Sequence, residues 1–219
     1  MLRALFEKTG SAVYISHLDL MRLFQRAFQR GKLPLTHTQG FNPRPSVSIA
    51  MLLSLGMESV CELLDFDLTG EAVAMETIRD TLNRNLIPGV RVLAVYDEGR
   101  KIKHLAYLRC AVTLEYDGGI PARAKEAIAA LFARESLTLE KKNRNGVTTQ
   151  DLIPMIRELT LEESSPRELT IHALVCCQNP TLNPMQLAAA IETYAPQWKP
   201  DFVRCRREEI YDTEMTVFR

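Results

Sequence analysis

The sequence predicts an α+β protein built from two tandem ferredoxin-like (βαββαβ) units with antiparallel sheets. The 219 residues suffice for two small domains. A content of 46% hydrophobic and 25% charged residues is typical of a packed globular chain. Strand-like and helix-like stretches then follow one another in the same order twice. We expect an N-terminal domain over residues 1–98 and a C-terminal domain over residues 105–219, with polar residues joining them.

The first half of the chain contains a strand–helix–strand–strand–helix–strand series. Its strands lie between turn residues, and its second helix has apolar side chains at helical spacing before Pro88-Gly89. The expected elements are Leu2–Lys8 (strand), a helix between Ser16 and Gly31, Ser46–Leu53 and Cys61–Leu68 (strands), Glu71–Leu86 (helix) and Val90–Tyr96 (strand).

The helix between Ser16 and Gly31 has clear start and stop signals. Ser16 is an N-cap residue with Asp19 three positions later, so each side chain is placed to accept a hydrogen bond from a backbone N–H. Ile15 and Leu20 have the spacing of a hydrophobic staple, and Gly31 is expected to end the helix.

The second half repeats the series with one ambiguous interval. The expected elements are Ala106–Tyr116 (strand), Pro121–Arg134 (helix), Leu137–Lys142 and Glu168–Cys177 (strands), a helix from Asn183 to Tyr194, and Val203–Tyr211 (strand). Pro154 disfavours a central strand or a long helix within Asn143–Ser165. That interval is therefore expected to form a turn with an irregular or edge element.

The formal net charge is zero, but the charges are unevenly distributed. Residues 1–50 contain seven Lys/Arg and two acidic residues, whereas residues 51–100 contain four Arg and nine acidic residues. A polyanionic partner would therefore bind a local patch near the N-terminus rather than the whole chain.

The cysteines and the N-terminus indicate a reduced, cytoplasmic protein. Five cysteines without a CxxC pair or a histidine at ligand spacing do not fit a zinc or iron–sulfur site, so we expect no metal and no cofactor on this chain. The first eight residues carry charges within their apolar stretch, unlike a signal peptide. No run approaches the roughly 18 apolar residues of a membrane span.

The first helix carries a row of basic side chains. Arg22, Arg26 and Arg30 recur every four residues beside Asp19. Such a row is either a solvated helix face, which every surface helix needs, or a surface that binds phosphate. His17, at the first helical position, is a candidate general acid or base, although a single histidine is more often structural.

The loop Pro34–Pro45 favours the phosphate-binding interpretation of this region. Its prolines and glycine exclude helix and central strand, and twelve residues are long for a connector. An aromatic ring, a cation and amides on a stiffened loop suit base stacking and contact with phosphate or sugar. Alternatively, the aromatic ring packs on the core. The candidate loop residues are His37, Gln39, Phe41, Asn42 and Arg44.

We also expect the loop to return along the first helix. It would then lie near Ser16–Arg26, with Gln39 or Asn42 hydrogen-bonded to the helix. His17 and Arg44 would be partly exposed in one concavity.

Several motifs resemble those of the radical-SAM-linked family of uncharacterised bacterial proteins. They are Phe6-Glu7-Lys8-Thr9-Gly10, Tyr14-Ile15-Ser16-His17-Leu18-Asp19-Leu20-Met21-Arg22, Gln39-Gly40-Phe41-Asn42-Pro43-Arg44-Pro45 and Leu52-Leu53-Ser54-Leu55-Gly56. The resemblance implies a radical SAM partner protein that carries an iron–sulfur cluster, S-adenosylmethionine and cobalamin. This chain lacks CxxxCxxC, so the cluster would belong to the partner.

From these features we expect an accessory module, not an enzyme on its own, that binds RNA or an RNA–protein substrate and presents it to the radical SAM partner. A second expectation is a metal-independent endoribonuclease with His17 as general acid or base, because the architecture resembles CRISPR repeat-processing endoribonucleases. Their C-terminal glycine-rich loop is missing, since Gln197–Arg219 contains no glycine. A third expectation is a protein–protein adaptor, because guanidinium groups also pair with carboxylates.

Overall fold

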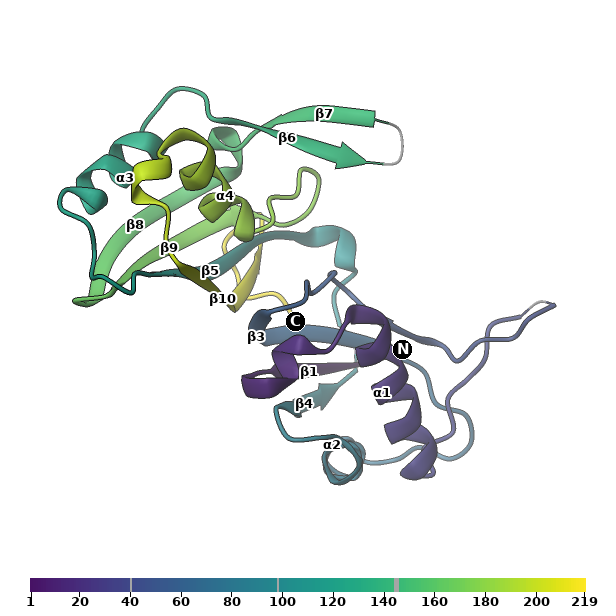
Figure 1. Ribbon diagram of the computed structural model, residues 1–219. Helices are drawn as coiled ribbons and strands as arrows, with labels where there is room; N and C mark the ends of the chain where they lie inside the picture. The colour runs from purple at the N-terminus through teal and green to yellow at the C-terminus, as the bar shows by residue number, and fades with distance from the viewer. Residues whose placement is uncertain (40, 98, 144–145) are drawn as a thin grey trace. The chain divides into compact units, whose positions relative to one another are not determined.

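The computed structural model describes residues 1–39, 41–97, 99–143 and 146–219, which form two compact units (Figure 1). The N-terminal unit comprises residues 1–102 and 218–219, and the C-terminal unit comprises residues 103–217. Both units are α+β, with helices packed on mostly antiparallel strands. Gly40 of the loop motif lies outside the described residues.

The N-terminal unit has a sheet in the order β4-β1-β3-β2. β1 is antiparallel to both β3 and β4, and β2 is antiparallel to β3. Its elements are β1 (Leu2–Lys8), η1 (Gly10–Tyr14), α1 (His17–Arg30), β2 (Val47–Ile49), β3 (Met57–Phe66), α2 (Met75–Asn85) and β4 (Val90–Tyr96), and η2 (Ile102–His104) follows at the boundary between the units. β2 is shorter than the expected Ser46–Leu53, because its pairing with β3 ends at Ile49 and is followed only by a hydrogen bond from the Ala50 N–H to the Leu63 carbonyl.

The apolar stripe of α1 packs on the sheet. Leu20, Phe24 and Phe28 are fully buried in one cluster with residues of β1, β3, β4 and α2. The Phe24 ring lies 4.8 Å from that of Phe6 on β1, and the Phe28 ring lies 4.9 Å from that of Phe66 on β3. This packing fixes which face of α1 remains available to a ligand.

Gly31 ends α1 as expected, but not through the left-handed conformation that usually favours glycine at a helix end. Its φ is −75°, which any residue adopts. A Cβ at this position would lie 2.5 Å from Thr81 Cγ2 on α2 and 3.1 Å from the Ala27 carbonyl oxygen. Glycine is required here because α1 and α2 approach each other closely.

The C-terminal unit has a sheet in the order β10-β5-β9-β8, with every neighbouring pair antiparallel. α3 contacts β8 and α4, and α4 contacts β5. Its elements are β5 (Leu105–Glu115), α3 (Ala124–Phe132), β6 (Thr138–Asn143), β7 (Gly146–Asp151), η3 (Ile153–Met155), β8 (Ile156–Ser165), β9 (Glu168–Cys176), α4 (Met185–Tyr194), η4 (Pro196–Trp198) and β10 (Phe202–Asp212).

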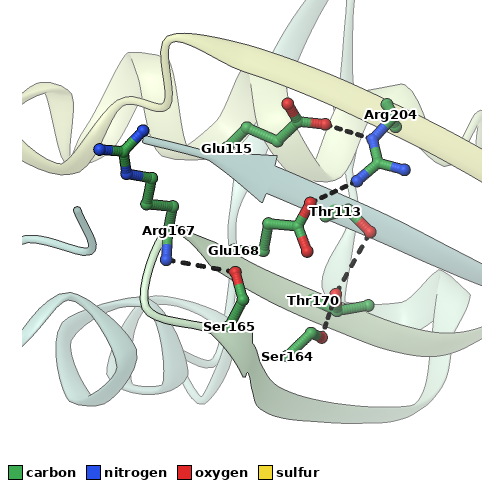
Figure 2. Close-up of polar contacts among 8 residues, drawn as sticks. All are labelled: Thr113, Glu115, Ser164, Ser165, Arg167, Glu168, Thr170 and Arg204. Atoms are coloured by element: carbon green, nitrogen blue, oxygen red, sulfur yellow. Dashed lines mark hydrogen bonds and ion pairs between the residues drawn. The ribbon is translucent and has the colours of Figure 1, made fainter. Parts of the chain in front are cut away.

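The two faces of this sheet differ in character. Along β5, alternate residues from Leu108 to Leu114 are buried in the core, and the residues between them are half-buried and mostly polar. On the polar face Arg204 forms ion pairs with both Glu115 and Glu168 (Figure 2). The Thr113 hydroxyl lies 3.2 Å from that of Thr170. The charge of Arg204 is thus already neutralised by neighbouring carboxylates.

The strand expected at Leu137–Lys142 forms, but it does not join the main sheet. β6 pairs with β7 in a separate two-stranded sheet, and β8 takes the edge position next to β9. β8 supplies two apolar side chains, Leu159 and Leu161, on one face, whereas β6 supplies only Leu139 between polar residues. Pro154 lies in η3, outside the strands, so the described residues 146–165 of this interval form a hairpin strand, a short turn and an edge strand.

Within the described part of the chain no helix is long and apolar enough to cross a membrane.

Candidate nucleic-acid interface

The start of α1 is held by reciprocal hydrogen bonds. The Asp19 backbone N–H donates to Ser16 Oγ (3.2 Å), and Ser16 Oγ donates to the Asp19 carboxylate (2.7 Å). The Arg22 guanidinium donates to the same carboxylate (2.9 Å). The hydrogen bond from Ser16, followed by that from Arg22, lowers the pKa of Asp19. The expected N-cap by Ser16 is therefore confirmed, whereas the Asp19 carboxylate accepts from the Ser16 hydroxyl and from Arg22 instead of from a backbone N–H.

The segment from Pro34 to Ser46, which we call the arm, is a hairpin rather than an irregular loop. The Ser46 N–H donates to the Thr36 carbonyl (2.7 Å), and the Thr38 N–H donates to the Arg44 carbonyl (2.8 Å). Arg44 N–H also donates to Thr38 Oγ1 (3.0 Å). The two sides of the arm project from the N-terminal unit (Figure 1).

The base of the arm is tied to the end of β3. The Thr36 N–H donates to the Asp67 carbonyl (2.9 Å), and the Thr69 N–H donates to the Pro34 carbonyl (2.8 Å). Leu35 forms a β-bridge with Leu68. The sequence predicted a stiffened segment from its prolines, and these hydrogen bonds join its base to the end of β3.

A groove of about 500 Å³ separates the arm base from the C-terminal half of α1. Its apolar surface comes from the exposed Pro34 and the half-buried Leu35 and Pro45, which lie over the buried Phe28 and Leu33. Cationic and amide side chains form its walls. The residues around this groove are Arg22, Gln25, Arg26, Phe28, Gln29, Leu33, Pro34, Leu35, His37 and Pro45.

The two arginines of the groove differ in their partners. Arg22 is bound to Asp19, and both side chains are more than half exposed. Arg26 is exposed and makes no ion pair with any residue that the structure describes, although its charge also helps to lower the pKa of Asp19, after Ser16 and Arg22. Arg26 is therefore the guanidinium of the groove that is available to an anionic ligand.

The structure brings Arg22, Arg26 and His37 together around the groove. Arg30 is exposed on the last turn of α1 but does not line the groove. His17 is half-buried at the other end of α1, and within the described residues its buried Nδ1 has no hydrogen-bond partner.

The remaining candidate residues are at or near the arm tip, away from the groove. Gln39, Asn42 and Arg44 are exposed, and Phe41 is fully exposed rather than packed on the core.

The expectation that the loop returns along Ser16–Arg26 is therefore wrong for the tip. The hydrogen bonds across the arm fold it on itself, so only its base lies beside α1. No hydrogen bond joins Gln39 or Asn42 to α1 in the described contacts, and neither His17 nor Arg44 lines the groove.

The sequence did not single out Gln25 and Gln29, which share the groove with the arginines. Residues 22, 25, 26 and 29 recur at three- and four-residue intervals, which is the spacing of one helix face. That periodicity was the available signal for them. Leu33 and Leu35 carried no such signal, because their place in the groove depends on the fold of the arm.

No group of three or more His, Cys, Asp or Glu residues with the arrangement of a metal site occurs in the described ranges. Four of the five cysteines are buried, and Cys176 is half-buried. Burial raises the pKa of Cys205 to about 12, so this thiol is protonated at neutral pH. The candidate site is thus one of guanidinium, imidazole and amide groups.

Fold and site together define a class: an α+β protein with a basic, partly apolar groove. Residues 1–184 match the family described as "Uncharacterized protein conserved in bacteria (DUF2344)", and the chain belongs to that family. No curated protein matches the chain.

Two solved structures are similar to the chain. One is a crystal structure of a Cbf5–Nop10–Gar1 complex, with 9% identity and a TM-score of 0.50 over 95% of this chain. The chain spans 48% of the length of that matched chain, and the likeness concerns the fold alone. The other is an unknown protein from Galdieria sulphuraria, with 13% identity, a TM-score of 0.27, and coverage of 94% of this chain and 96% of that one.

Proposed function

We propose that this protein is an accessory module that binds RNA, or an RNA–protein substrate, in the groove between α1 and the arm. The observation that carries the proposal is the Arg26 guanidinium without an ion-pair partner among the described residues, next to Arg22 and His37 and the apolar surface of the groove. Guanidinium groups bind phosphate, while an apolar surface accepts the face of a base or sugar.

The arm adds a second element of RNA recognition. Phe41 is fully exposed near the tip, although exposure of a large aromatic ring to water is unfavourable. A base that stacks on this ring would remove it from water, and stacking tolerates any sequence because every base has a π-face. Arg44, on the same arm, supplies a cation for the neighbouring phosphate.

The partner in this proposal is a radical SAM protein. It rests on the resemblance of the motifs around His17 and Phe41 to the radical-SAM-linked family, and it assigns the iron–sulfur cluster, S-adenosylmethionine and cobalamin to that partner. The role of this chain would be to hold the substrate, since its groove contains cations and amides that bind and orient.

For the fold, we propose that both units are variants of the ferredoxin-like unit. The support in the N-terminal unit is the element order βαββαβ with the sheet order β4-β1-β3-β2. In the C-terminal unit the same order is obtained from β5, α3, β8, β9, α4 and β10 when the β6–β7 hairpin is treated as an insertion.

The alternative of a metal-independent endoribonuclease rests on His17. Its half-buried ring at the start of α1 has a buried Nδ1 that none of the described side chains orients. A general acid or base needs one nitrogen within reach of the 2′-hydroxyl or leaving oxygen. Incubation of structured RNA with the protein in EDTA distinguishes the two functions. Cleavage that disappears in His17→Ala would establish the nuclease, whereas intact bound RNA supports the binding module.

The binding function is tested by titrating total bacterial RNA into the protein at several salt concentrations. Phosphate contacts release counterions, so affinity should fall steeply as salt rises. Binding that does not depend on salt, or no binding at low salt, would contradict the proposal. The third function, a protein–protein adaptor in which the arginines dock on acidic side chains, would be favoured if the protein bound its radical SAM partner but no RNA.

A further inference from the structure

β8 occupies an edge of the sheet in the C-terminal unit. It pairs with β9 over Ile156–Ser165, and the strand order of the described residues places no further strand on its other side. In an antiparallel pair, alternate backbone N–H and C=O groups of an edge strand point away from the sheet. A ten-residue strand therefore presents a row of hydrogen-bonding groups that an added strand can pair with.

A groove of about 600 Å³ runs between this edge and α3. Leu159 and Leu161 of β8 and Phe132 of α3 give it apolar walls. Ala129 and Ala133 also line it, and because both are small and exposed they leave space for side chains from another chain.

The carboxylates on β8 have different roles on its two faces. Glu158 pairs with Arg109 (3.3 Å) and Glu162 pairs with His172 (3.2 Å), both on the face away from α3. Glu163 lines the groove with Leu159 and Leu161, is exposed, and makes no ion pair in the part of the chain that the structure describes. Lys125 and Glu126 of α3 also line the groove, so with Glu163 its lining carries one more negative than positive side chain and favours a basic side chain from a partner.

We infer that this edge binds an extended segment of a partner protein by strand addition. The segment pairs its backbone with β8, inserts alternate apolar side chains between Leu161 and Ala129, and places a Lys or Arg beside Glu163. Recognition of this kind obtains affinity from main-chain hydrogen bonds and specificity from the pockets for alternate side chains.

Charge argues against a second copy of this chain as the occupant. β8 contains three Glu and one Arg, so two antiparallel copies would bring acidic rows together across the new strand pair. Like charges opposite one another on neighbouring strands are destabilising. A basic, partly apolar segment complements the edge instead.

The probe is a display library of random twelve-residue peptides, selected on the whole protein. We expect enrichment of sequences with apolar residues at every second position and a Lys or Arg at another position of that same alternate series, so that the cation lies on the groove face beside Glu163. Addition of an enriched peptide should slow backbone amide exchange within Ile156–Ser165, because the outward N–H groups become hydrogen-bonded. Enrichment of acidic peptides, or binding that leaves exchange in β8 unchanged, would overturn the inference.

Two matched pairs of variants make the test specific. Ala129→Trp fills the groove and should weaken the enriched peptide by about tenfold or more, whereas Ala130→Trp, on the same helix but outside the groove, should not. Glu163→Lys should reverse the charge preference, and Glu162→Lys on the other face should not.

Equal effects within either pair would overturn the inference. A homodimer in light scattering that Ala129→Trp dissociates would do the same, because the occupant would then be a second copy. Circular dichroism of each variant verifies that the fold is retained.

Discussion

Arg3 and Asp65 form a two-point ion pair across β1 and β3 in the interior of the N-terminal unit. Arg3 Nε and Nη2 donate to the two Asp65 oxygens at 2.5 and 2.9 Å, and Nη1 donates to the Arg100 carbonyl at 2.7 Å. The fully buried Phe218 ring lies 5.7 Å from the Arg3 guanidinium. The pair thereby connects the first strand to the last residues of the chain, which belong to the same unit.

Removal of one member of this pair should strongly destabilise the fold. Asp65→Asn leaves the Arg3 charge buried without its counter-ion, and such a change costs about 3–5 kcal/mol. Urea denaturation measures the loss. Asp80→Asn is the matched control, because Asp80 pairs with Arg79 on the surface and such pairs contribute about 0–1 kcal/mol. Equal losses in the two variants would show that the buried pair has no special role.

Gly31→Ala should destabilise the protein although alanine favours helices. The new Cβ would lie 2.5 Å from Thr81 Cγ2, and overpacking of this kind costs about 1–3 kcal/mol. Gly118→Ala is the control, because a Cβ there would meet nothing within 4 Å. Thermal unfolding of both variants tests this, and a Gly31→Ala protein more stable than the wild type would refute the close approach of α1 and α2.

Ser16→Ala should cost about 0.5–2 kcal/mol through loss of the N-cap. The exposed Ser11, for which no side-chain hydrogen bond is described, provides the control Ser11→Ala, and urea denaturation compares the two.

Asp19 gives the same region a pH dependence. Its folded-state pKa is lowered by Ser16 and then Arg22, so its contribution to stability is present above about pH 4 and is lost as the pH falls through that lowered pKa. The difference in melting temperature between wild type and Asp19→Asn should therefore shrink on acidification from pH 7. A difference that grew on acidification would contradict the assignment.

Local sequence signals predicted where helices and strands lie better than they predicted which strands pair with one another. Ser16 and Asp19 determine a cap through short-range hydrogen bonds, so α1 was predicted correctly at both ends. The pairing of β6 with β7 instead of the main sheet depends on which strand supplies more apolar surface, as Leu159 and Leu161 of β8 do. Periodicity within one strand carries no information about that choice.

The candidate site was predictable to a similar degree. The arginine spacing on α1 identified Arg22 and Arg26. The same spacing includes Arg30, so the sequence could not show that Arg30 lies outside the groove. The groove exists because Leu35 bridges to Leu68 and Thr36 bonds to Asp67, which are contacts between distant positions.

Phe41→Ala should weaken RNA binding without lowering stability. The ring is fully exposed, so its removal leaves the core intact, whereas loss of base stacking costs about 1–3 kcal/mol. Fluorescence anisotropy with a labelled single-stranded RNA measures the first effect and thermal unfolding the second. Phe202→Ala provides the control, since Phe202 is an exposed aromatic residue of the other unit. Unchanged RNA affinity in Phe41→Ala would remove the arm tip from the interface.

The most direct test of the proposed RNA groove compares Arg26→Ala with Arg30→Ala in anisotropy titrations of the same RNA over a range of salt concentrations. Both arginines are exposed on α1, but only Arg26 lines the groove. We predict that Arg26→Ala weakens binding for all RNA sequences and reduces the slope of log affinity against log salt by about one, with a clearly smaller change for Arg30→Ala. Equal effects of the two substitutions, or an unchanged salt slope in Arg26→Ala, would contradict the proposal that the groove binds RNA.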